Sequence, residues 1–408
     1  MNKEYFDRAC RVTPGGVHSP VRAFRGVGGV PRFIASAKGV ILEDIEGMSY
    51  TDYCLAFGPM IFGHQDPDVL EAVQAALHRG WSYGTAEPYS LLLAECIVKH
   101  VPHIEKIRFV NSGTEAVMAA LRVARAATGR SLIVKCDGGY HGHADSMLVR
   151  SGSGLAEMTE PDSAGVSRLV AQETLVVPLS DFDAIPRVFD ERGASIAAII
   201  LEGVPANYGL LPYAPGYLRH VQECAHRAGS LLILDEVITG FRCGFGGVAA
   251  QEHLDPDLIT YGKIIGGGFP VGAYGGKSCF MDLVAPLGAV YQAGTLSANP
   301  VAMTAGFVTL TKLLTDPPYE RFEVLGKMLD QVPGMQRMGS IFWPVIGSTQ
   351  TVRKPSDTPT QHREFYPKLF HKALAAHVYL APSAFEVGFL ATPHTEADIA
   401  KLLGLLKD

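Results

Sequence analysis

Two side chains with reactive groups follow short apolar runs in the middle of the chain. Asp235 comes directly after the apolar run 231–234, and Lys263 follows the run 258–260 and precedes a glycine-rich stretch. A carboxylate at the carboxyl end of a buried strand lies at the edge where open α/β sheets bind ligands. A lysine with few polar neighbours is poorly solvated, which lowers its pKa and makes the amine a competent nucleophile.

Together, this aspartate and lysine fit the requirements of pyridoxal phosphate: a lysine amine for covalent attachment, and a carboxylate that keeps the pyridine nitrogen protonated. Other interpretations stay open on these residues alone. Lys263 is also compatible with a solvated turn, and Asp235 with a helix cap or with the magnesium-binding acid of a P-loop ATPase. The ATPase needs G-x-x-x-x-G-K-[ST], and the nearest stretch, 272–278, is one residue short of that spacing.

A third requirement, a phosphate site, is met by Ser112, Gly113 and Thr114. They follow the apolar run 107–110 and open an alanine-rich stretch, 114–127, that predicts a helix. The first-turn amides, the helix dipole and two hydroxyls would hold a dianion. An ordinary helix N-cap is the alternative.

The loop 138–145 alternates glycine with polar side chains. His141, His143 and Asp145 suggest a metal, but a glycine-broken loop holds ligands less rigidly than metal sites usually do, so we expect none. Beside the aspartate, the lysine and the candidate phosphate site, the favoured interpretation of this loop is that Tyr140 stacks on a flat cofactor ring.

The elements that must position these residues alternate between strand and helix. Apolar runs predict buried strands at 107–110, 132–134, 196–201, 231–234 and 258–260, with helices expected at 114–127 and 215–228. This alternation is typical of an α/β fold with a mostly parallel sheet. We expect a large domain over 55–310, an N-terminal arm and part of a small domain over 1–54, and the rest of the small domain over 311–408.

The composition excludes several classes of protein. The 408 residues carry 35 basic and 41 acidic side chains, a balance that gives no case for a nucleic-acid partner. No apolar run approaches the ~18 residues of a membrane span. The seven cysteines show no CxxC pairing, and the first residues lack a hydrophobic signal core, so we expect a cytoplasmic protein with reduced thiols.

The ordered set of motifs resembles the class III aminotransferases of fold type I. The matching stretches are 112–116, 140–142, 235–237 and 262–263. Further stretches, 14–24, 141–145, 291–297 and 380–386, are similar to the branch of this family that moves an amino group within one molecule. The resemblance, over nearly the whole chain, implies conversion of glutamate 1-semialdehyde to 5-aminolevulinate for tetrapyrrole synthesis. It also implies a homodimer that uses pyridoxal 5'-phosphate and pyridoxamine 5'-phosphate, with a large cofactor-binding domain and a smaller α+β domain built from both chain ends.

Carried over residue by residue, the resemblance implies a role for each site residue. Lys263 would bind the cofactor covalently and move protons, and Asp235 would bond the pyridine nitrogen. Around the cofactor, Ser112, Gly113, Thr114 and the partner subunit's Thr295 would hold the phosphate, Tyr140 would stack on the ring, and Asn207 would lie near its oxygen. Toward the substrate, Arg22 would bind the carboxylate, Ser153 would belong to a loop over the site, and Glu386 would line the pocket.

The sequence also departs from the pattern of that branch. Ala298 and Gly203 stand where the branch usually has glycine and proline, Phe57 lies where tryptophan is common, and the region 330–365 is shorter. Two other functions therefore remain to be separated by experiment. One is a transaminase for a β- or ω-amino acid, which would require a separate keto acid acceptor. The other is a relative that binds the cofactor without turnover.

Overall fold

The computed structural model describes residues 1–151 and 159–407, and the chain forms two compact units. The large unit comprises Asp68–Pro205 and Leu211–Pro317, and the small unit comprises Met1–Pro67, Ala206–Leu210 and Pro318–Asp408. We expected boundaries after residues 54 and 310. The units instead divide at 67/68 and 317/318, and the short segment 206–210 belongs with the two chain ends.

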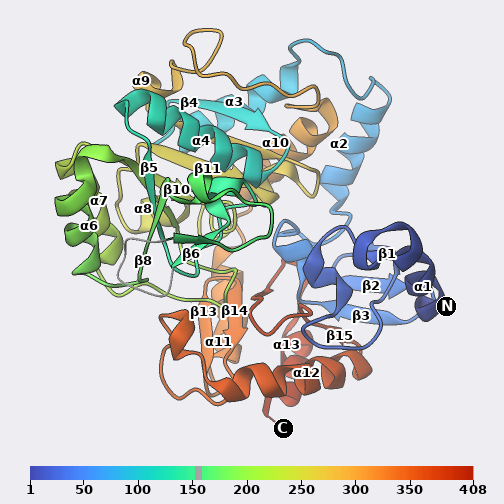
Figure 1. The fold of residues 1–408 in the computed structure, drawn as a ribbon. Coiled ribbons are helices and arrows are strands. Elements are labelled where there is room, and N and C mark those ends of the chain that lie inside the picture. Colours follow the sequence, from blue (N-terminus) through green and yellow to red (C-terminus); the bar gives the residue numbers. More distant parts are fainter. Residues whose placement is uncertain (152–158, 408) are drawn as a thin grey trace. The chain divides into compact units, whose positions relative to one another are not determined.

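A seven-stranded sheet forms the centre of the large unit (Figure 1). Its spatial order is β4 (Lys106–Val110), β12 (Gly272–Gly276), β11 (Leu258–Gly262), β10 (Leu231–Asp235), β9 (Ile196–Glu202), β5 (Leu132–Cys136) and β8 (Thr174–Val177). All neighbours pair in parallel except β12, which is antiparallel to both β11 and β4. The five predicted strands and the mostly parallel sheet are confirmed.

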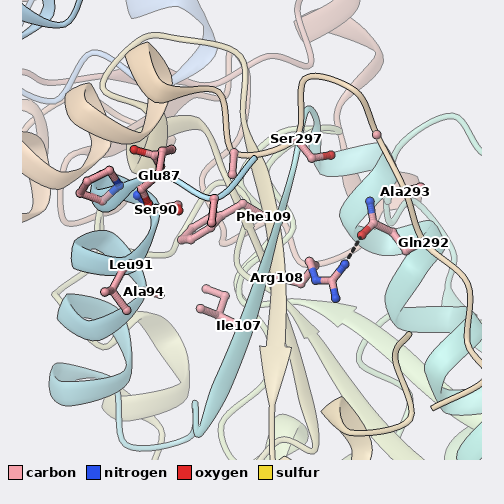
Figure 2. A pocket seen from close by; sticks show the side chains of 14 residues that line it. Glu87, Ser90, Leu91, Ala94, Ile107, Arg108, Phe109, Gln292, Ala293 and Ser297 are labelled. Carbon is pink, nitrogen blue, oxygen red and sulfur yellow. Dashed lines mark hydrogen bonds between the residues drawn. The ribbon is translucent and has the colours of Figure 1, made fainter. Parts of the chain in front are cut away.

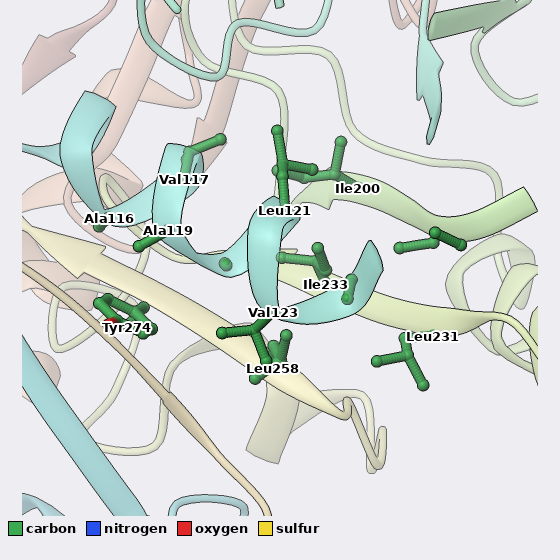
Figure 3. Packing of buried hydrophobic residues seen from close by; sticks show 14 of the residues in the cluster. Ala116, Val117, Ala119, Leu121, Val123, Ile200, Leu231, Ile233, Leu258 and Tyr274 are labelled. Carbon is green, nitrogen blue, oxygen red and sulfur yellow. The ribbon is translucent and has the colours of Figure 1, made fainter. Parts of the chain in front are cut away.

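The sheet is covered on both faces. Every residue of β9, β10 and β11 is buried. Leu231 and Ile233 of β10 belong to a core cluster with α4 (Gly113–Thr128), which crosses this face, as Figure 3 shows. Because side chains alternate along a strand, the equally buried Leu232 and Leu234 point to the opposite face. This is the pattern of a strand covered by helices on both sides.

The helices of the large unit follow the expected alternation, and the predicted helices at 114–127 and 215–228 correspond to α4 and to α7 (Tyr217–Arg227). The remaining elements outside the sheet complete the unit: α2 (Pro67–Leu77), α3 (Pro88–His100), the hairpin β6 (Val149–Ser151) and β7 (Thr159–Pro161), α5 (Arg168–Ala171), α6 (Ala184–Arg192), α8 (Gly247–Gln251), α9 (Ser278–Met281) and α10 (Pro300–Thr315). Among the described residues, no helix is both long and apolar enough to cross a membrane.

The register of the sheet brings several strand ends to one edge. Asp235, the last residue of β10, pairs with Glu202 on one side and Thr260 on the other. Gly272, the first residue of β12, pairs with Gly262 and with Val110, the last residues of β11 and β4. The strands β11 and β4, on either side of β12, therefore end at the same edge of the sheet. The segments that follow β4, β10 and β11 therefore start close together.

The small unit contains two sheets. One has the order β1 (Ile34–Lys38), β2 (Ile41–Asp44), β3 (Ser49–Asp52) and β15 (Val378–Tyr379), and the other has the order β13 (Met335–Met338), β14 (Ile341–Pro344) and β16 (Gly388–Phe389). Its helices are α1 (Asn2–Val12), α11 (Tyr319–Leu329), α12 (Thr360–Ala375) and α13 (Glu396–Lys407). Short 3-10 turns include Pro20–Ala23 and Leu55–Phe57. The region 330–365 thus holds two ordered strands and the start of α12.

Candidate functional site

Asp235 lies buried at the carboxyl edge of the large sheet, where its carboxylate is held from two sides. The Nδ1 of His141 lies 2.8 Å from one oxygen, and the amide of Val237 donates to the other at 3.1 Å. His141 is 1% exposed and Asp235 5% exposed, so the pair is shielded from water. Since a carboxylate only accepts hydrogen bonds, His141 must carry its proton on Nδ1. The histidine thereby fixes the orientation of the carboxyl group.

Lys263 begins a 3-10 turn at the end of the neighbouring strand β11. It has a φ of +50°, in the left-handed region, directly after the extended Gly262. A non-glycine residue there is strained, and such strain gathers at functional sites when the surrounding fold imposes it. The side chain is half-buried. Lys263 and Asp235 therefore stand at the ends of adjacent parallel strands, as the sequence predicts.

Ser112 closes the N-terminus of α4 with a reciprocal cap. Its hydroxyl accepts from the amide of Glu115 at 3.2 Å, and the Glu115 carboxylate accepts from the amide of Asn111 at 2.9 Å. The Ser112 hydroxyl is thus an ordinary N-cap here, the alternative left open by the sequence. The cap orients the first turn, whose amides at Gly113 and Thr114 are among those that a helix leaves for external acceptors. An anion site at this point is compatible with the cap.

The loop after β5 packs directly on this first turn. Gly142 has a φ of +80°, and a Cβ placed on it would lie 2.5 Å from Oγ1 and 2.7 Å from Cα of Thr114. The amide of His143 donates to that Oγ1 at 3.3 Å. Only glycine therefore lets the loop approach the turn so closely.

Tyr140 is anchored through its backbone, and the residue is 47% exposed. Its amide donates to Glu202 at 3.0 Å. Glu202 is buried at the end of β9, beside Asp235 in the register. An exposed ring on a fixed backbone is suited to cover a planar ligand.

Sequence reasoning missed the roles of His141 and Glu236. The first was weighed only as a metal ligand, although its place in the loop after β5, between Tyr140 and Gly142, puts it within reach of Asp235. Glu236 is buried, bonds to Thr239 and accepts from the amide of Ala249 at 2.8 Å. Burial raises the pKa of Glu236 to about 7. This carboxyl fixes the chain that follows Asp235.

The stretch 272–278 does not form a phosphate-binding loop, and the three residues weighed as metal ligands lie in different surroundings. The stretch 272–278 forms β12 and the start of α9, and Lys277 pairs with Asp255 at 2.9 Å and Asp257 at 3.5 Å. His141 is buried on Asp235, whereas His143 and Asp145 are exposed. No group of three or more potential metal ligands gathers within residues 1–151 and 159–407.

The small unit holds Arg22, Asn207 and Glu386. Arg22 is exposed, and the following Phe24 anchors its turn by packing edge-to-face on Phe370 of α12 at 5.1 Å. Burial raises the pKa of the Cys54 thiol well above its ordinary value; among the lesser influences, Glu386 raises it and Arg22 lowers it. These two charged groups therefore lie in the same neighbourhood of the small unit.

Beside Cys54, the backbone takes an unusual course. Leu55, Ala56 and Phe57 have φ values of +46°, +55° and +64°, and Gly58 continues at +115°. The carboxylate of Asp52 holds the start of this turn by accepting from the amides of Cys54 and Leu55 at 2.8 and 2.9 Å. Phe57, where tryptophan was expected, is half-buried on this turn.

Thr295 lies in an exposed loop of the large unit, beside a pocket of about 1000 Å³. Figure 2 shows this pocket between α3, β4 and the loop, with Arg108 bonded to Gln292 at 3.1 Å. None of the predicted site residues that the structure describes lines this pocket. Tyr291 and Leu296, on either side of Thr295, are 72% and 54% exposed. Ser153 lies outside the described residues.

Comparisons with known proteins agree with this geometry. Residues 24–335 match the family model for aminotransferase class-III. A glutamate-1-semialdehyde 2,1-aminomutase of Leptospira interrogans is 53% identical over 98% of this chain and 94% of its own length. An omega-transaminase structure from Sphaerobacter thermophilus is 32% identical, with a TM-score of 0.90 over 100% of this chain and 97% of that one. A glutamate-1-semialdehyde aminomutase structure from Pseudomonas aeruginosa PAO1, at 24% identity and a TM-score of 0.88 over 100% of this chain and 93% of that one, shares the fold.

The chain therefore belongs to the class-III aminotransferases, enzymes of the fold that the seven-stranded sheet defines. Within that family, its identity to the Leptospira protein along nearly the whole chain makes it a member of the glutamate-1-semialdehyde 2,1-aminomutase group.

The residues at the sheet edge fit the cofactor of this family. The buried Asp235 can face a protonated pyridine nitrogen with a fixed carboxylate. Gly142 packs so closely on Thr114 at the first turn of α4 that a larger side chain would displace this turn. Lys263, at the end of the adjacent strand, carries an amine of the kind that covalent attachment of this cofactor requires.

Proposed function

We propose that this protein converts glutamate 1-semialdehyde to 5-aminolevulinate, a step of tetrapyrrole synthesis, with pyridoxal 5'-phosphate and pyridoxamine 5'-phosphate as cofactor forms. The amino group lies on the second carbon of the substrate and on the first carbon of the product, and the carbonyl group takes the other of these two positions, so substrate and product are isomers. The observation that carries the proposal is the buried Asp235 and His141 pair beside the strained Lys263, in a chain 53% identical to an aminomutase. When bound, the cofactor supplies a carrier for the amino group and a sink for electrons.

The residues of the large unit hold the cofactor and move protons. The first-turn amides of Gly113 and Thr114, with the hydroxyls of Ser112 and Thr114, bind the phosphate. The carboxylate of Asp235 retains the proton of the pyridine nitrogen, and Tyr140 covers the ring. The amine of Lys263, as a general acid and base, takes a proton from one carbon and returns it to another.

The residues of the small unit recognise the substrate. Arg22 binds the substrate carboxylate in a two-pronged geometry. Asn207 bonds the ring oxygen of the cofactor, and Glu386 lines the substrate pocket.

We further propose a cytoplasmic homodimer in which Thr295 reaches the phosphate of the partner subunit. The support is the exposure of Tyr291 and Leu296, which flank Thr295 in one loop. Large exposed apolar side chains are typical of interaction surfaces. Light scattering of the purified protein, and of a Tyr291→Ser and Leu296→Ser double variant, tests the dimer. A wild-type mass of one chain would contradict it.

A transaminase that uses a separate amino acceptor is the second candidate, favoured by the match to the Sphaerobacter omega-transaminase. The two functions differ in one requirement. Purified protein supplied with glutamate 1-semialdehyde and no keto acid should form 5-aminolevulinate over many turnovers. Turnover that stops after about one equivalent per site and resumes on adding a keto acid would favour the transaminase.

A further inference from the structure

Two segments of the small unit that lie far apart in the sequence are joined to each other. Gly209, in the segment 206–210, donates its amide to the carbonyl of Phe385 at 2.6 Å. The adjacent Tyr208 stacks on the Phe385 ring, with centroids 4.3 Å apart and planes inclined by 21°. Asn207 precedes Tyr208 and Glu386 follows Phe385. The join therefore links the backbones that carry both residues.

The second segment is fixed by two buried donors on one carbonyl. Nε1 of Trp343 lies 2.8 Å from the carbonyl oxygen of Ala384, and Nε2 of His362 lies 2.6 Å from it. Both rings have 0% exposure. Nδ1 of His362 accepts from the amide of Ile346 at 3.1 Å, so the proton is on Nε2. Burial lowers the pKa of His362 and preserves this neutral form.

Trp343 also contacts the first segment. A Cβ placed on Gly209 would lie 2.4 to 2.6 Å from Cη2, Cζ2 and Cζ3 of the indole, and Gly209 has a φ of +82°. The six-membered part of one buried ring thus packs on the segment of Asn207, while its N–H holds the segment of Glu386.

Arg363 closes the same arrangement from the exposed side. Its guanidinium lies 5.2 Å from the centroid of the Phe385 ring and 3.4 Å from the hydroxyl of Tyr208. The cation of Arg363 is attracted to the face of the Phe385 ring. The same guanidinium also donates a hydrogen bond to the hydroxyl of Tyr208, whose ring stacks on Phe385. One turn further along α12, Tyr366 donates to the carbonyl of Ala381 at 2.8 Å. Helix α12 thus supports the residues 381–386 at several points.

We propose that Trp343, His362 and Arg363 are positioning residues that hold the segments 206–210 and 383–386 as one body. They thereby set the place of Asn207 toward the cofactor and the place of Glu386 toward the substrate. The inference rests on the proposed function for the roles of these two residues, but the mechanical coupling does not depend on it. None of the three positioning residues is assigned contact with substrate or cofactor.

The test compares two exposed cations of α12 that each lie over a phenylalanine. Arg363→Ala removes the contact with Phe385 and Tyr208. Lys368→Ala, the matched control, removes a cation 4.9 Å from the centroid of Phe365, which is outside both segments. Since both side chains are exposed, neither change endangers folding. The readouts are hydrogen exchange at the amides of Gly209 and Glu386 in the cofactor-loaded protein, and the KM for glutamate 1-semialdehyde.

We expect Arg363→Ala to accelerate exchange at Gly209 and Glu386 together and to raise KM about two- to fivefold, the change that loss of one exposed cation–π contact allows. The kcat should stay at the wild-type value, because Asp235, Lys263 and the first turn of α4 belong to the large unit. The control should change none of these. Trp343→Phe should give the same pattern more strongly, since it loses the N–H and the outer ring.

Wild-type exchange at both amides in Arg363→Ala, or acceleration at Glu386 alone, would overturn the proposal that the segments form one body. Unchanged KM with accelerated exchange would overturn the positioning role. If wild-type protein does not turn over the semialdehyde, the proposed function fails. The exchange data would then still decide whether the segments are coupled.

Discussion

At the scale of single residues, Asp235 shows how a buried charge is tolerated and used. Taking a carboxylate out of water is costly unless it is paired and hydrogen-bonded, and His141 and Val237 meet that need. One lone-pair direction of the carboxyl group can then face a pyridinium nitrogen. The arrangement makes Asp235 a fixed charge aimed at the position where the electron sink is required.

Asp235→Asn should leave the fold and cofactor binding largely intact and lower kcat about a hundredfold to a thousandfold, because an amide cannot hold the nitrogen proton by charge. Asp257→Asn is a suitable control. Asp257 is also a buried aspartate with a histidine partner, His226 at 2.9 Å, but it precedes β11 and lies at the opposite edge of the sheet. Stopped-flow or steady-state kinetics give both values. Near-native kcat in Asp235→Asn would remove this residue from the mechanism.

Ala298 stands where the related branch of the family usually has glycine, and this difference should lower the stability of the fold. Its φ of +55° lies in the left-handed region, which costs an alanine about 1–2 kcal/mol relative to its ordinary conformations. Ala298→Gly should raise the free energy of unfolding by about 0.5–1 kcal/mol, after the added freedom of the unfolded chain is subtracted. Ala293→Gly in the same loop, which has no positive φ, should lower it. Denaturant titrations of both variants would show whether the signs differ; a destabilised Ala298→Gly would contradict the strain.

At the scale of elements, the strands that carry the site were predictable because each is an apolar run bounded by turn residues. The strand β12 was not. Its sequence, Gly-Ala-Tyr-Gly-Gly, has little strand propensity, yet its glycines are required by close packing. A Cβ on Gly272 would lie 2.0 Å from the carbonyl oxygen of Ser112, and one on Gly276 2.1 Å from that of Asp257. The neighbouring backbones come this close only in the assembled sheet. In the sequence, the glycines are the one sign of that close approach.

The same reasoning about the first turn of α4 gives a prediction. Gly142→Ala should displace Thr114 and weaken cofactor binding about tenfold, which corresponds to about 1.4 kcal/mol. Gly129→Ala is the matched control, since Gly129 also has a positive φ, of +67°, but a Cβ there meets nothing within 4 Å. Cofactor titration followed by absorbance measures both. Equal affinities in the two variants would show that the approach of Gly142 to Thr114 does not shape the phosphate site.

At the scale of the whole molecule, the sequence predicts a large domain and a smaller one built from both chain ends, but it does not predict that the segment 206–210 belongs with the chain ends. This segment lies between β9 and α7 of the large unit, and local pattern alone would leave it there. It belongs to the small unit because Gly209 packs under Trp343 and bonds to Phe385. Such long-range contacts are set by packing between residues more than a hundred positions apart, and no local sequence pattern encodes them.

The free energy of unfolding of the whole protein should depend on pH through the titration of Glu236. Its pKa rises from an ordinary value of 4.5 to about 7 in the folded state, so the folded protein binds more protons than the unfolded chain between these values. The free energy of unfolding should therefore fall as pH rises from about 4.5 to 7. The steepest slope corresponds to a difference of up to one bound proton between the folded and the unfolded state. Glu236→Gln removes this contribution, and its stability should change less with pH over that window. Denaturant unfolding at several pH values tests this, and parallel curves for the two proteins would contradict it.

The most direct test of the central claim is the formation of 5-aminolevulinate by purified protein from glutamate 1-semialdehyde in the absence of any amino acceptor, measured for the wild type, Lys263→Ala and Lys277→Ala. Lys277 is paired with Asp255 and Asp257 at the opposite edge of the sheet and serves as the control. We expect sustained turnover in the wild type and in Lys277→Ala. Lys263→Ala should retain the cofactor without a covalent link that borohydride can trap, and should show no sustained turnover. Multiple turnovers by Lys263→Ala, or none by the wild type, would contradict the assignment of this site to intramolecular amino transfer.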